Sequence, residues 1–292
     1  MNDFLPGLYI VSTPIGNLED ITLRALKVLK NSDQILCEDT RRSLKLLNYY
    51  DIKKKLVSNH KFNEKNVANS VVELLQKGKI ISIISDAGTP TLSDPGQILI
   101  KECMKKNIKI FPIPGASAVT TAISVSGFND KYFFYGFLPK KSNEIEKICN
   151  ELKNYNYSIV FFLPVIKFNF YLKYFKKFFS GRKIFVAREM TKIHETFYRH
   201  NLESFEGLKT NVKGEITVVL SKKNSKKTRD INLDNEKLSV EILKYLKRYS
   251  LKDVVKLISE KNGIPKKTIY KLCLKLKKKW KIILISFFYS VF

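Results

Sequence analysis

Four short loops rich in glycine and proline contain the residues best suited to bind a ligand. They cover residues 13–17, 85–90, 93–96 and 112–117, and each comes closely after a predicted β-strand. In a parallel sheet such loops meet at the carboxyl edge, where open α/β folds bind their ligands, and small residues let the backbone approach a ligand closely. One loop of this kind would be an ordinary tight turn, whereas four together predict a pocket of nucleotide size.

The same loops lack the patterns by which proteins hold phosphate groups. Neither G-x-G-x-x-G nor G-x-x-x-x-G-K-[ST] occurs in the chain, and the four loops contain no Lys or Arg. A cationic ligand that carries an adenosine, such as a sulfonium, would instead favour backbone carbonyls and a nearby acid. Asp86 supplies such an acid, so the loops favour this class of ligand without fixing it.

Acidic and basic residues converge in two further segments, 38–42 and 188–192. Four of the eight arginines lie in or beside them: Arg41, Arg42, Arg188 and Arg199. Because the chain uses Lys elsewhere, Arg at these positions indicates planar bidentate contacts to phosphate or carboxylate. Internal ion pairs with Glu38, Asp39 and Glu189 account equally well for each arginine.

The chain is strongly basic. It has 53 Lys and Arg against 27 Asp and Glu, which gives a formal net charge of +26 over 292 residues. Such a charge argues against an ordinary neutral metabolic enzyme and favours RNA, DNA or an acidic membrane surface as the partner. A Lys-rich composition written by an AT-rich genome is the competing account.

The first half of the chain alternates apolar strands with amphipathic helices, which predicts a mostly parallel sheet between helices. The predicted strands are 8–12, 34–37, 79–84 and 108–111, and the predicted helices are 20–30, 42–47, 64–77, 96–106 and 116–126. The second half predicts a mixed sheet with strands at 132–137, 158–163, 183–188, 195–199 and 215–221. We therefore expect two α/β domains, residues 1–128 and 129–221.

A charged linker, 222–235, precedes a predicted helical module, 236–281, with a helix-turn-helix outline. From residue 221 onward there are 20 Lys and Arg against 6 Asp and Glu. Four lysines at helical spacing would share one face that holds an RNA backbone, unless they form only a solvated surface: Lys267, Lys271, Lys275 and Lys278. The apolar tail 282–292 is too short to span a bilayer, so we expect it to pack on the body or on a dimer partner.

The four cysteines and three histidines do not have metal-ligand spacing. No two cysteines are closer than 46 positions, so no C-x-x-C pair exists and no metal is indicated. Since no secretory leader follows Met1, we expect a cytoplasmic chain with reduced thiols.

An ordered set of motifs across residues 8–220 resembles the RsmI family of the tetrapyrrole-methylase superfamily, with a weaker helical match near 250–272. The motifs are Thr13-Pro14-Ile15-Gly16-Asn17-Leu18, Glu38-Asp39-Thr40-Arg41, Ser85-Asp86-Ala87-Gly88-Thr89-Pro90, Asp94-Pro95-Gly96, Pro114-Gly115, Gly136-Phe137-Leu138-Pro139, Ala187-Arg188-Glu189, Glu195-Thr196 and Lys213-Gly214-Glu215. Members of this family methylate the ribose 2′ hydroxyl of a cytidine in small-subunit (16S) ribosomal RNA.

The resemblance implies a fold of two α/β domains with S-adenosylmethionine in the cleft between them, 16S ribosomal RNA or the small ribosomal subunit as partner, and a homodimer. By position in the family motifs, the cofactor contacts would be Asp86, Gly88, Thr89, Pro114, Gly115, Ser117 and Ala118.

The reacting hydroxyl must lose its proton. We expect Asp39 or Glu189 to act as the base, and Lys192 or Arg41 to hold phosphate or assist electrostatically. Arg42 and Arg188 are expected to contact RNA. For Asp39 and Glu189, a structural role beside the nearby arginines is an equally good interpretation.

The sequence departs from the family in the second domain, where the family has an acid and then a His-Arg pair. Leu163, Ile166 and Lys167 replace these residues, which puts their polar contacts in doubt. Two alternatives therefore stay open: a methylase of the same superfamily that acts on a tetrapyrrole or another small molecule, and a non-catalytic RNA-binding protein that keeps the fold. The basic helical module argues against the first alternative, and the departure at Leu163 favours the second.

Overall fold

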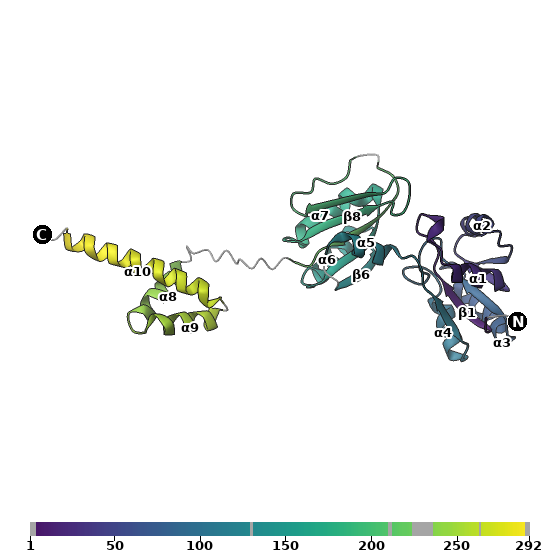
Figure 1. Cartoon of the computed structure of the whole chain (residues 1–292), viewed down its shortest axis with the longest axis horizontal. Coiled ribbons are helices and arrows are strands. Elements are labelled where there is room, and N and C mark those ends of the chain that lie inside the picture. The colour runs from purple at the N-terminus through teal and green to yellow at the C-terminus, as the bar shows by residue number, and fades with distance from the viewer. Residues whose placement is uncertain (1–3, 129–130, 210–211, 224–235, 263, 290–292) are drawn as a thin grey trace. The chain divides into compact units, whose positions relative to one another are not determined.

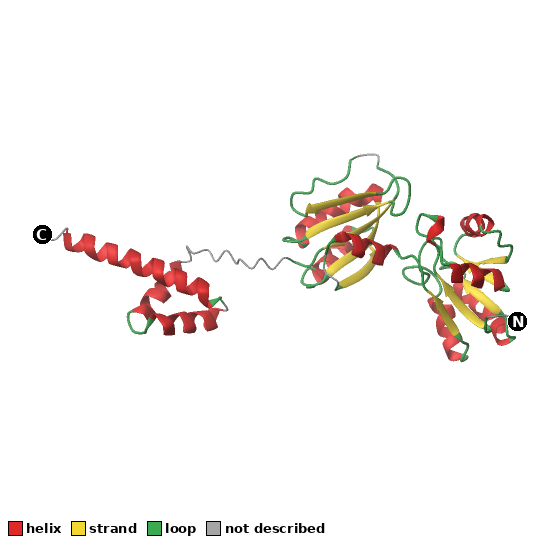
Figure 2. Cartoon of the chain, in the orientation of Figure 1, coloured by secondary structure: helices red, strands yellow, loops and turns green. Residues whose placement is uncertain are grey.

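The computed structural model of the chain describes residues 4–128, 131–209, 212–223, 236–262 and 264–289 (Figures 1 and 2). The side chains of residues 236–237 and 278–289 lie outside this description. By their contacts the residues form two compact units, Met1–Asn224 and Ser225–Phe292.

The first sheet is parallel and lies between two layers of helices (Figure 2). Its strand order is β3-β2-β4-β1-β5, and every neighbouring pair is parallel. The strands are β1 (Gly7–Val11), β2 (Gln34–Cys37), β3 (Lys55–Ser58), β4 (Ile80–Ile83) and β5 (Ile110–Ile113). All four residues of β4 are buried, as expected for a strand that is covered on both faces.

Two apolar clusters cover the two faces of this sheet. Ala25, Val28 and Leu47 pack on one face, and they come from α1 (Leu23–Asn31) and α2 (Thr40–Tyr49). Val71 and Leu99 pack on the other, from α3 (Glu64–Gln76) and α4 (Gln97–Lys105). The predicted parallel α/β arrangement is therefore confirmed for this sheet.

The structure differs from the sequence prediction in two places of the first sheet. Strand β3 was not predicted, because its sequence KLVS is short, mixed in polarity and only partly buried at the sheet edge. Helix α1 begins at Leu23 rather than at Asp20, since residues Leu18–Asp20 form a 3-10 turn (η1) and the Thr22 hydroxyl caps α1 by accepting from the Ala25 amide at 3.1 Å.

The second sheet is mixed, as predicted. Its order is β6-β7-β10-β8-β9, in which only the β6–β7 pair is parallel. The strands are β6 (Tyr132–Phe137), β7 (Ser158–Pro164), β8 (Lys183–Arg188), β9 (Thr196–Asn201) and β10 (Glu215–Leu220). Helices α6 (Ser142–Leu152) and α7 (Phe168–Phe178) cover one face through an aromatic core that includes Phe161, Phe168 and Phe175, and a 3-10 turn, η2 (Val165–Lys167), precedes α7.

Helix α5 (Ala118–Ser126) joins the two sheets within this unit. It follows β5 of the first sheet, but Val119 and Ala122 pack against Val160, Phe185 and Val219 on the other face of the second sheet. Gly127 ends the helix in the left-handed region at φ 73°. The proposed boundary between residues 128 and 129 therefore follows a helix whose apolar side belongs to the second sheet, and the boundary itself stays a prediction.

The second unit has three helices within its described residues. Its helices are α8 (Glu236–Leu246), α9 (Leu251–Asn262) and α10 (Lys266–Tyr289). The sequence predicted a helix-turn-helix outline, which corresponds to α9 and α10, and did not predict α8 as a separate helix. Ile242, Val254, Ile258 and Ile269 form its core. The predicted cap at Ser250 is present, because its hydroxyl accepts from the Asp253 amide at 3.3 Å and donates to the Asp253 carboxylate at 2.6 Å.

The predicted linker 222–235 lies almost entirely outside the described residues. Helix α10 continues through residue 289, so its backbone includes most of the apolar tail 282–292. No helix in the described part of the chain has both the length and the apolar character that crossing a membrane requires.

Candidate active site

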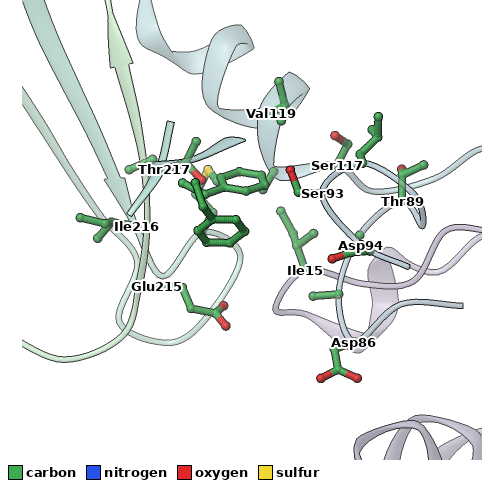
Figure 3. Close-up of a pocket in the computed structure, with 18 of the residues that line it drawn as sticks. Ile15, Asp86, Thr89, Ser93, Asp94, Ser117, Val119, Glu215, Ile216 and Thr217 are labelled. Carbon is green, nitrogen blue, oxygen red and sulfur yellow. The ribbon is translucent and has the colours of Figure 1, made fainter. Parts of the chain in front are cut away.

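A cavity of about 520 Å³ lies between the loops of the first sheet and the ends of the second. Figure 3 shows Ile15, Ser93 and Asp94 on one side of it, facing Glu215 and Ile216 on the other. Each of the four Gly- and Pro-rich loops contributes at least one residue to its wall, through Ile15, Asp86, Asp94 and Ser117. This volume is typical of a small-molecule site.

Hydrogen bonds fix three of these loops to one another. Thr13 and Gly88 exchange backbone hydrogen bonds of 2.9 and 3.0 Å, which Gly88 permits at φ 80°. The Thr89 hydroxyl donates to the Ala116 carbonyl at 3.2 Å and lies 3.0 Å from the Ser12 hydroxyl. These hydrogen bonds hold three loops of the cavity wall in fixed positions relative to one another.

Of the seven residues expected to contact the cofactor, five line the cavity and two do not. The five are Asp86, Gly88, Thr89, Ser117 and Ala118. Pro114 and Gly115 are absent from the lining. A Cβ atom at Gly115 would lie 3.0 Å from the Ser12 Cβ, so Gly115 is small because it packs against the chain after β1.

Of the four residues expected to act in catalysis, Glu189 and Lys192 line the cavity. The Lys192 ammonium donates to the carboxylates of Glu189 at 3.0 Å and Glu215 at 2.9 Å. Burial alone would lower the pKa of Lys192, but the two carboxylates outweigh it and raise that pKa. Lys192 is therefore a fixed cation at the cavity wall.

Glu189 is held in an uncommon conformation. Its φ is 52°, and its carboxylate accepts from the Glu215 amide at 2.8 Å, lying against Gly214, where a Cβ would clash at 2.6 Å. Burial would raise the pKa of Glu189, but the hydrogen bonds from the Glu215 amide and Lys192 lower it overall. The carboxylate is thus ionised and precisely placed.

Asp39 and Arg41 lie outside the cavity lining and pair with each other. Asp39 caps α2 by accepting from the Arg41 amide at 2.9 Å, and the Arg41 guanidinium donates to both of its oxygens at 3.1 and 2.7 Å. These hydrogen bonds lower the pKa of Asp39 to about 2. Such a carboxylate is a weak base, so the local structural role is the better supported interpretation.

The two arginines expected to contact RNA have different surroundings. Arg42 lines the cavity, and its guanidinium lies 3.3 Å from the Asp86 carboxylate while the side chain stays 64% exposed. Arg188 instead donates to the carbonyls of Lys213 and His194 at 2.7 and 3.1 Å. Arg188 therefore braces two loops of the second sheet.

Sequence reasoning predicted Asp86 as an acid of the cavity but missed that two further carboxylates join it. Glu38, Asp86 and Asp94 all line the cavity. Burial, followed by the charge of Glu38, raises the pKa of Asp94 to about 6, while a hydrogen bond with Ser85 opposes this. The sequence analysis placed Asp94 in one of the four loops. Its burial and its proximity to other carboxylates depend on the folded structure and could not be seen in the sequence. A titratable group perturbed in this way inside a cavity marks a candidate functional residue.

The two sheets meet directly at this site. Gly16 lies against the loop after β8, because a Cβ there would come within 2.6 Å of the Met190 carbonyl and the Lys192 side chain. The Asn17 amide donates to the Thr191 hydroxyl at 3.0 Å. The loop 13–17 therefore sets the position of Lys192 relative to the first sheet.

The departure from the family motif has a clear structural outcome. Leu163 is buried in the core of the second sheet and lines the cavity, whereas Ile166 is 89% exposed in the turn η2. Leu163 thus gives an apolar surface to the wall where an acid was expected.

In the second unit, the described lysines of the predicted RNA-binding face are exposed: Lys267, Lys271 and Lys275 on α10. The side chain of Lys278 lies outside the described residues. Cys37, Cys103, Cys149 and Cys273 are free and buried, and burial raises the pKa of Cys149 to about 12. Within the described residues, no group of three or more His, Cys, Asp or Glu side chains is placed to hold a metal ion.

Known proteins that are similar in sequence to this chain include methylases and methyltransferases. Residues 7–206 match the family of tetrapyrrole (corrin/porphyrin) methylases. The chain is 47% identical over 221 residues to ribosomal RNA small subunit methyltransferase I of Thermotoga maritima, covering 74% of this chain and 98% of the relative. It is 35% identical over 273 residues to the protein of the same name from Halalkalibacterium halodurans, covering 91% and 93%.

Solved structures show the same fold at low sequence identity. Uroporphyrin-III-C-methyltransferase from Thermus thermophilus gives a TM-score of 0.54 at 16% identity, covering 74% of this chain and 94% of that chain. Diphthine synthase gives 0.58 at 12% identity, covering 73% and 89%.

The two sheets and the cavity between their ends, together with the match of residues 7–206 to the family model, define an α/β protein of the methylase class. The chain belongs to the tetrapyrrole methylase family and, within it, to the ribosomal RNA small subunit methyltransferases I. It is therefore a methyltransferase, and its family implies a cofactor of the S-adenosylmethionine type.

Proposed function

We propose that this enzyme transfers a methyl group from S-adenosylmethionine to the ribose 2′ hydroxyl of a cytidine in small-subunit (16S) ribosomal RNA. The observation that carries the proposal is one cavity with an acidic end, at Asp94, and a separate fixed ion pair, Glu189 with Lys192. Relatives at 35–47% identity are named ribosomal RNA small subunit methyltransferase I, which supports ribosomal RNA as the substrate. Such a substrate would place the enzyme in the cytoplasm, and a homodimer stays a prediction.

The residues of the cavity fit S-adenosylmethionine. Its sulfonium and ammonium groups are cations. Burial, and after it repulsion by the neighbouring carboxylate of Glu38, raises the pKa of Asp94 to about 6. A bound cation would relieve this repulsion. Ser117 and Ala118, at the start of α5, and Thr89 and Gly88 would hold the remaining groups of the cofactor.

S-adenosylmethionine supplies an already activated methyl group, so the protein must chiefly position the hydroxyl and remove its proton. Lys192 would stabilise the negative charge that develops on the ribose oxygen. Glu189 would hold the Lys192 ammonium in place and, as the one of the two predicted bases that lines the cavity, would accept the proton despite its lowered pKa. The conformation of Glu189 at φ 52° supports this assignment, since an uncommon backbone conformation is often retained at functional sites.

The second unit would hold RNA through its backbone. Lys267, Lys271 and Lys275 are exposed on one face of α10, while Ile269 and Leu272 of the same helix are buried in the module core. A cationic face on an apolar base suits contact with phosphates and carries no base specificity. A small tetrapyrrole substrate would have no use for this face.

The direct test is methyl transfer in vitro with a radiolabelled cofactor. We expect unmethylated small ribosomal subunits to be labelled in their RNA and uroporphyrinogen to remain unlabelled. Label in the porphyrin alone would favour the small-molecule alternative. Cofactor binding without labelled RNA or porphyrin would favour the non-catalytic alternative.

A further inference from the structure

The segment after β3 lies at the rim of the cavity. Strands β2 and β3 are parallel neighbours with Cys37 opposite Ser58, so the chain leaves both strands at the same edge of the sheet. The Asn59 amide donates to the Cys37 carbonyl at 2.8 Å, and the Ser58 hydroxyl donates to the Glu38 carbonyl at 3.4 Å. The loop 59–63 is therefore adjacent to Glu38, which lines the cavity.

Electrostatics supports this placement. Burial and the charge of Asp86 raise the pKa of Glu38, while the positive charge of Arg42 and the nearby His60 oppose this rise. His60 thus lies close enough to act on a carboxylate of the cavity wall.

The loop is braced although its tip is exposed. The His60 amide donates to the Asn63 side-chain oxygen at 2.8 Å, and the Asn63 side-chain nitrogen donates to the Ser58 carbonyl at 2.9 Å. The Phe62 amide donates to the His60 Nδ1 at 3.3 Å. Glu64, which follows, is buried at the start of α3. Such a loop presents its tip at little further entropic cost when a ligand binds.

Phe62 is that tip, and its side chain is 93% exposed. An isolated exposed apolar residue needs no explanation by itself, but Phe62 follows a lysine in a loop that leaves the sheet at the same edge as the segment with Arg41 and Arg42. Lys61 is exposed, and the side chains of Arg41 and Arg42, in the first turn of α2 after the neighbouring strand β2, are 86% and 64% exposed. An exposed ring beside cations at the rim of a reaction cavity is the combination by which proteins hold unpaired nucleotides.

We propose that Phe62 stacks on an unpaired base of the RNA substrate next to the nucleotide whose ribose enters the cavity, with Lys61 and Arg42 on the adjoining phosphates. This inference rests on the proposed function. A ribose hydroxyl can enter a cavity only if its nucleotide leaves regular stacking, and single-stranded RNA is usually held by aromatic side chains in this way. Phe62 would replace the stacking that the neighbouring base loses.

The kinetic test compares Phe62→Leu with Phe62→Trp. Leu keeps apolar volume without a ring face, so we expect KM for unmethylated small ribosomal subunits to rise about tenfold, a change typical for loss of one stacked base. The kcat and the cofactor affinity should stay at the wild-type values, and Phe62→Trp should retain the wild-type KM. The matched control is Tyr49→Leu. It removes another exposed aromatic ring, at the C-terminal end of α2, opposite the end that carries Arg41 and Arg42.

A binding test separates this inference from the proposed function. In a Trp280→Phe background, the Phe62→Trp variant carries the chain's only tryptophan. We expect a single-stranded oligocytidine to quench its fluorescence and an abasic oligonucleotide of equal length to quench it much less. Equal quenching by both, or an unchanged KM in an active Phe62→Leu enzyme, would overturn the stacking role alone. RNA methylation missing from the wild type would overturn the proposed function instead. A change of oligomeric state on Phe62→Leu, measured by sedimentation, would show that Phe62 contacts a second copy and would also overturn the stacking role.

Discussion

The buried carboxylate of Glu64 accepts a hydrogen bond of 2.9 Å from the backbone amide of Gly96, thirty-two residues further along the chain. The same oxygen accepts from the Ile98 amide at 2.8 Å. Glu64 therefore caps α4 from the start of α3 and closes the loop that carries Asp94. That loop contains Thr91 and Ser93 at φ 70° and 78°, both in the left-handed region, so it depends on outside contacts for its shape.

We expect Glu64→Ala to lower the free energy of unfolding by about 2 kcal/mol, because the buried Gly96 amide and the partly buried Ile98 amide lose their acceptor. Cofactor affinity should fall several-fold, since Asp94 is no longer held. Glu64→Gln keeps an oxygen at the same place and should restore both properties. Urea unfolding and calorimetric titration measure the two effects, with exposed Glu73→Ala on α3 as control. A Glu64→Ala enzyme with wild-type cofactor affinity would show that the cap does not position the site.

The raised pKa of Asp94 predicts a pH-dependent cofactor affinity. A cationic ligand favours the ionised carboxylate, so affinity should fall as the pH drops through about 6, by about tenfold at pH 5. Asp94→Asn should bind more weakly at pH 7 and lose this dependence. Calorimetric titrations between pH 5 and 8 provide the measurement, and an equally steep profile in Asp94→Asn would assign the titration to another group.

The raised pKa of Asp94 also predicts that its ionised form, which favours cofactor binding, lowers the stability of the folded protein. Its pKa in the folded protein, about 6, lies above the ordinary value of 3.8, so the folded state holds the proton more tightly. Ionised Asp94 then costs stability as the pH rises through this range. Asp94→Asn should be more stable than the wild type at pH 8 by about 1 kcal/mol, after allowance for solvent screening, and this gain should vanish at pH 4.

Much of the site was predictable because parallel topology brings the ends of separate strands to one edge. Asp86, Gly88 and Thr89 could be placed at a cavity from that rule and the family motif. The sequence does not reveal that Arg41 neutralises Asp39 locally, or that Gly115 packs on Ser12. These outcomes depend on side-chain packing between segments far apart in the chain.

The same limit applies to the fold. The strongly apolar strand β4 was evident, whereas the edge strand β3 lacks an apolar run. Periodicity located α5 but could not tell which sheet its apolar side would cover. Asp94 was visible only as part of a turn motif, since its raised pKa results from burial beside Glu38.

Lys192 should matter more to the rate than to cofactor binding. We expect Lys192→Met to lower kcat about a hundredfold, because a positioned charge at a developing oxyanion is usually worth that much, and to leave cofactor affinity within a few-fold. Single-turnover methyl transfer measures the effect. Lys177→Met removes a lysine with a similar pairing, 2.8 Å from Glu146 on the outer helices, and should be silent. Loss of activity in both variants would point to a general effect of charge.

Arg182 is a buried cation held by carbonyl groups. Only 2% of it is exposed, and it donates to the carbonyls of Tyr157 at 2.9 Å and Ser221 at 2.8 Å as well as to that of Tyr155. Burial lowers its pKa to about 10, so it stays charged at neutral pH. Arg182→Met should cost about 3 kcal/mol in the free energy of unfolding, since it leaves these carbonyls without donors. A loss below 1 kcal/mol in urea unfolding would contradict this structural role.

The lysines of α10 should set the salt dependence of RNA binding. Replacing Lys267, Lys271 and Lys275 together with Gln removes three exposed charges, so the slope of log affinity against log salt should become shallower by about 2. Cofactor affinity should not change. The same replacement at exposed Lys27, Lys30 and Lys53 of the first unit is the control. An unchanged slope in the α10 variant would mean that its positive charge is compositional.

The central claim is tested most directly by mapping 2′-O-methylation across small-subunit ribosomal RNA at single-nucleotide resolution. Cells that lack this enzyme should lose the modification at one cytidine, the wild-type gene should restore it, and the Lys192→Met gene should restore it poorly. An unchanged methylation map in the deletion strain would contradict the account.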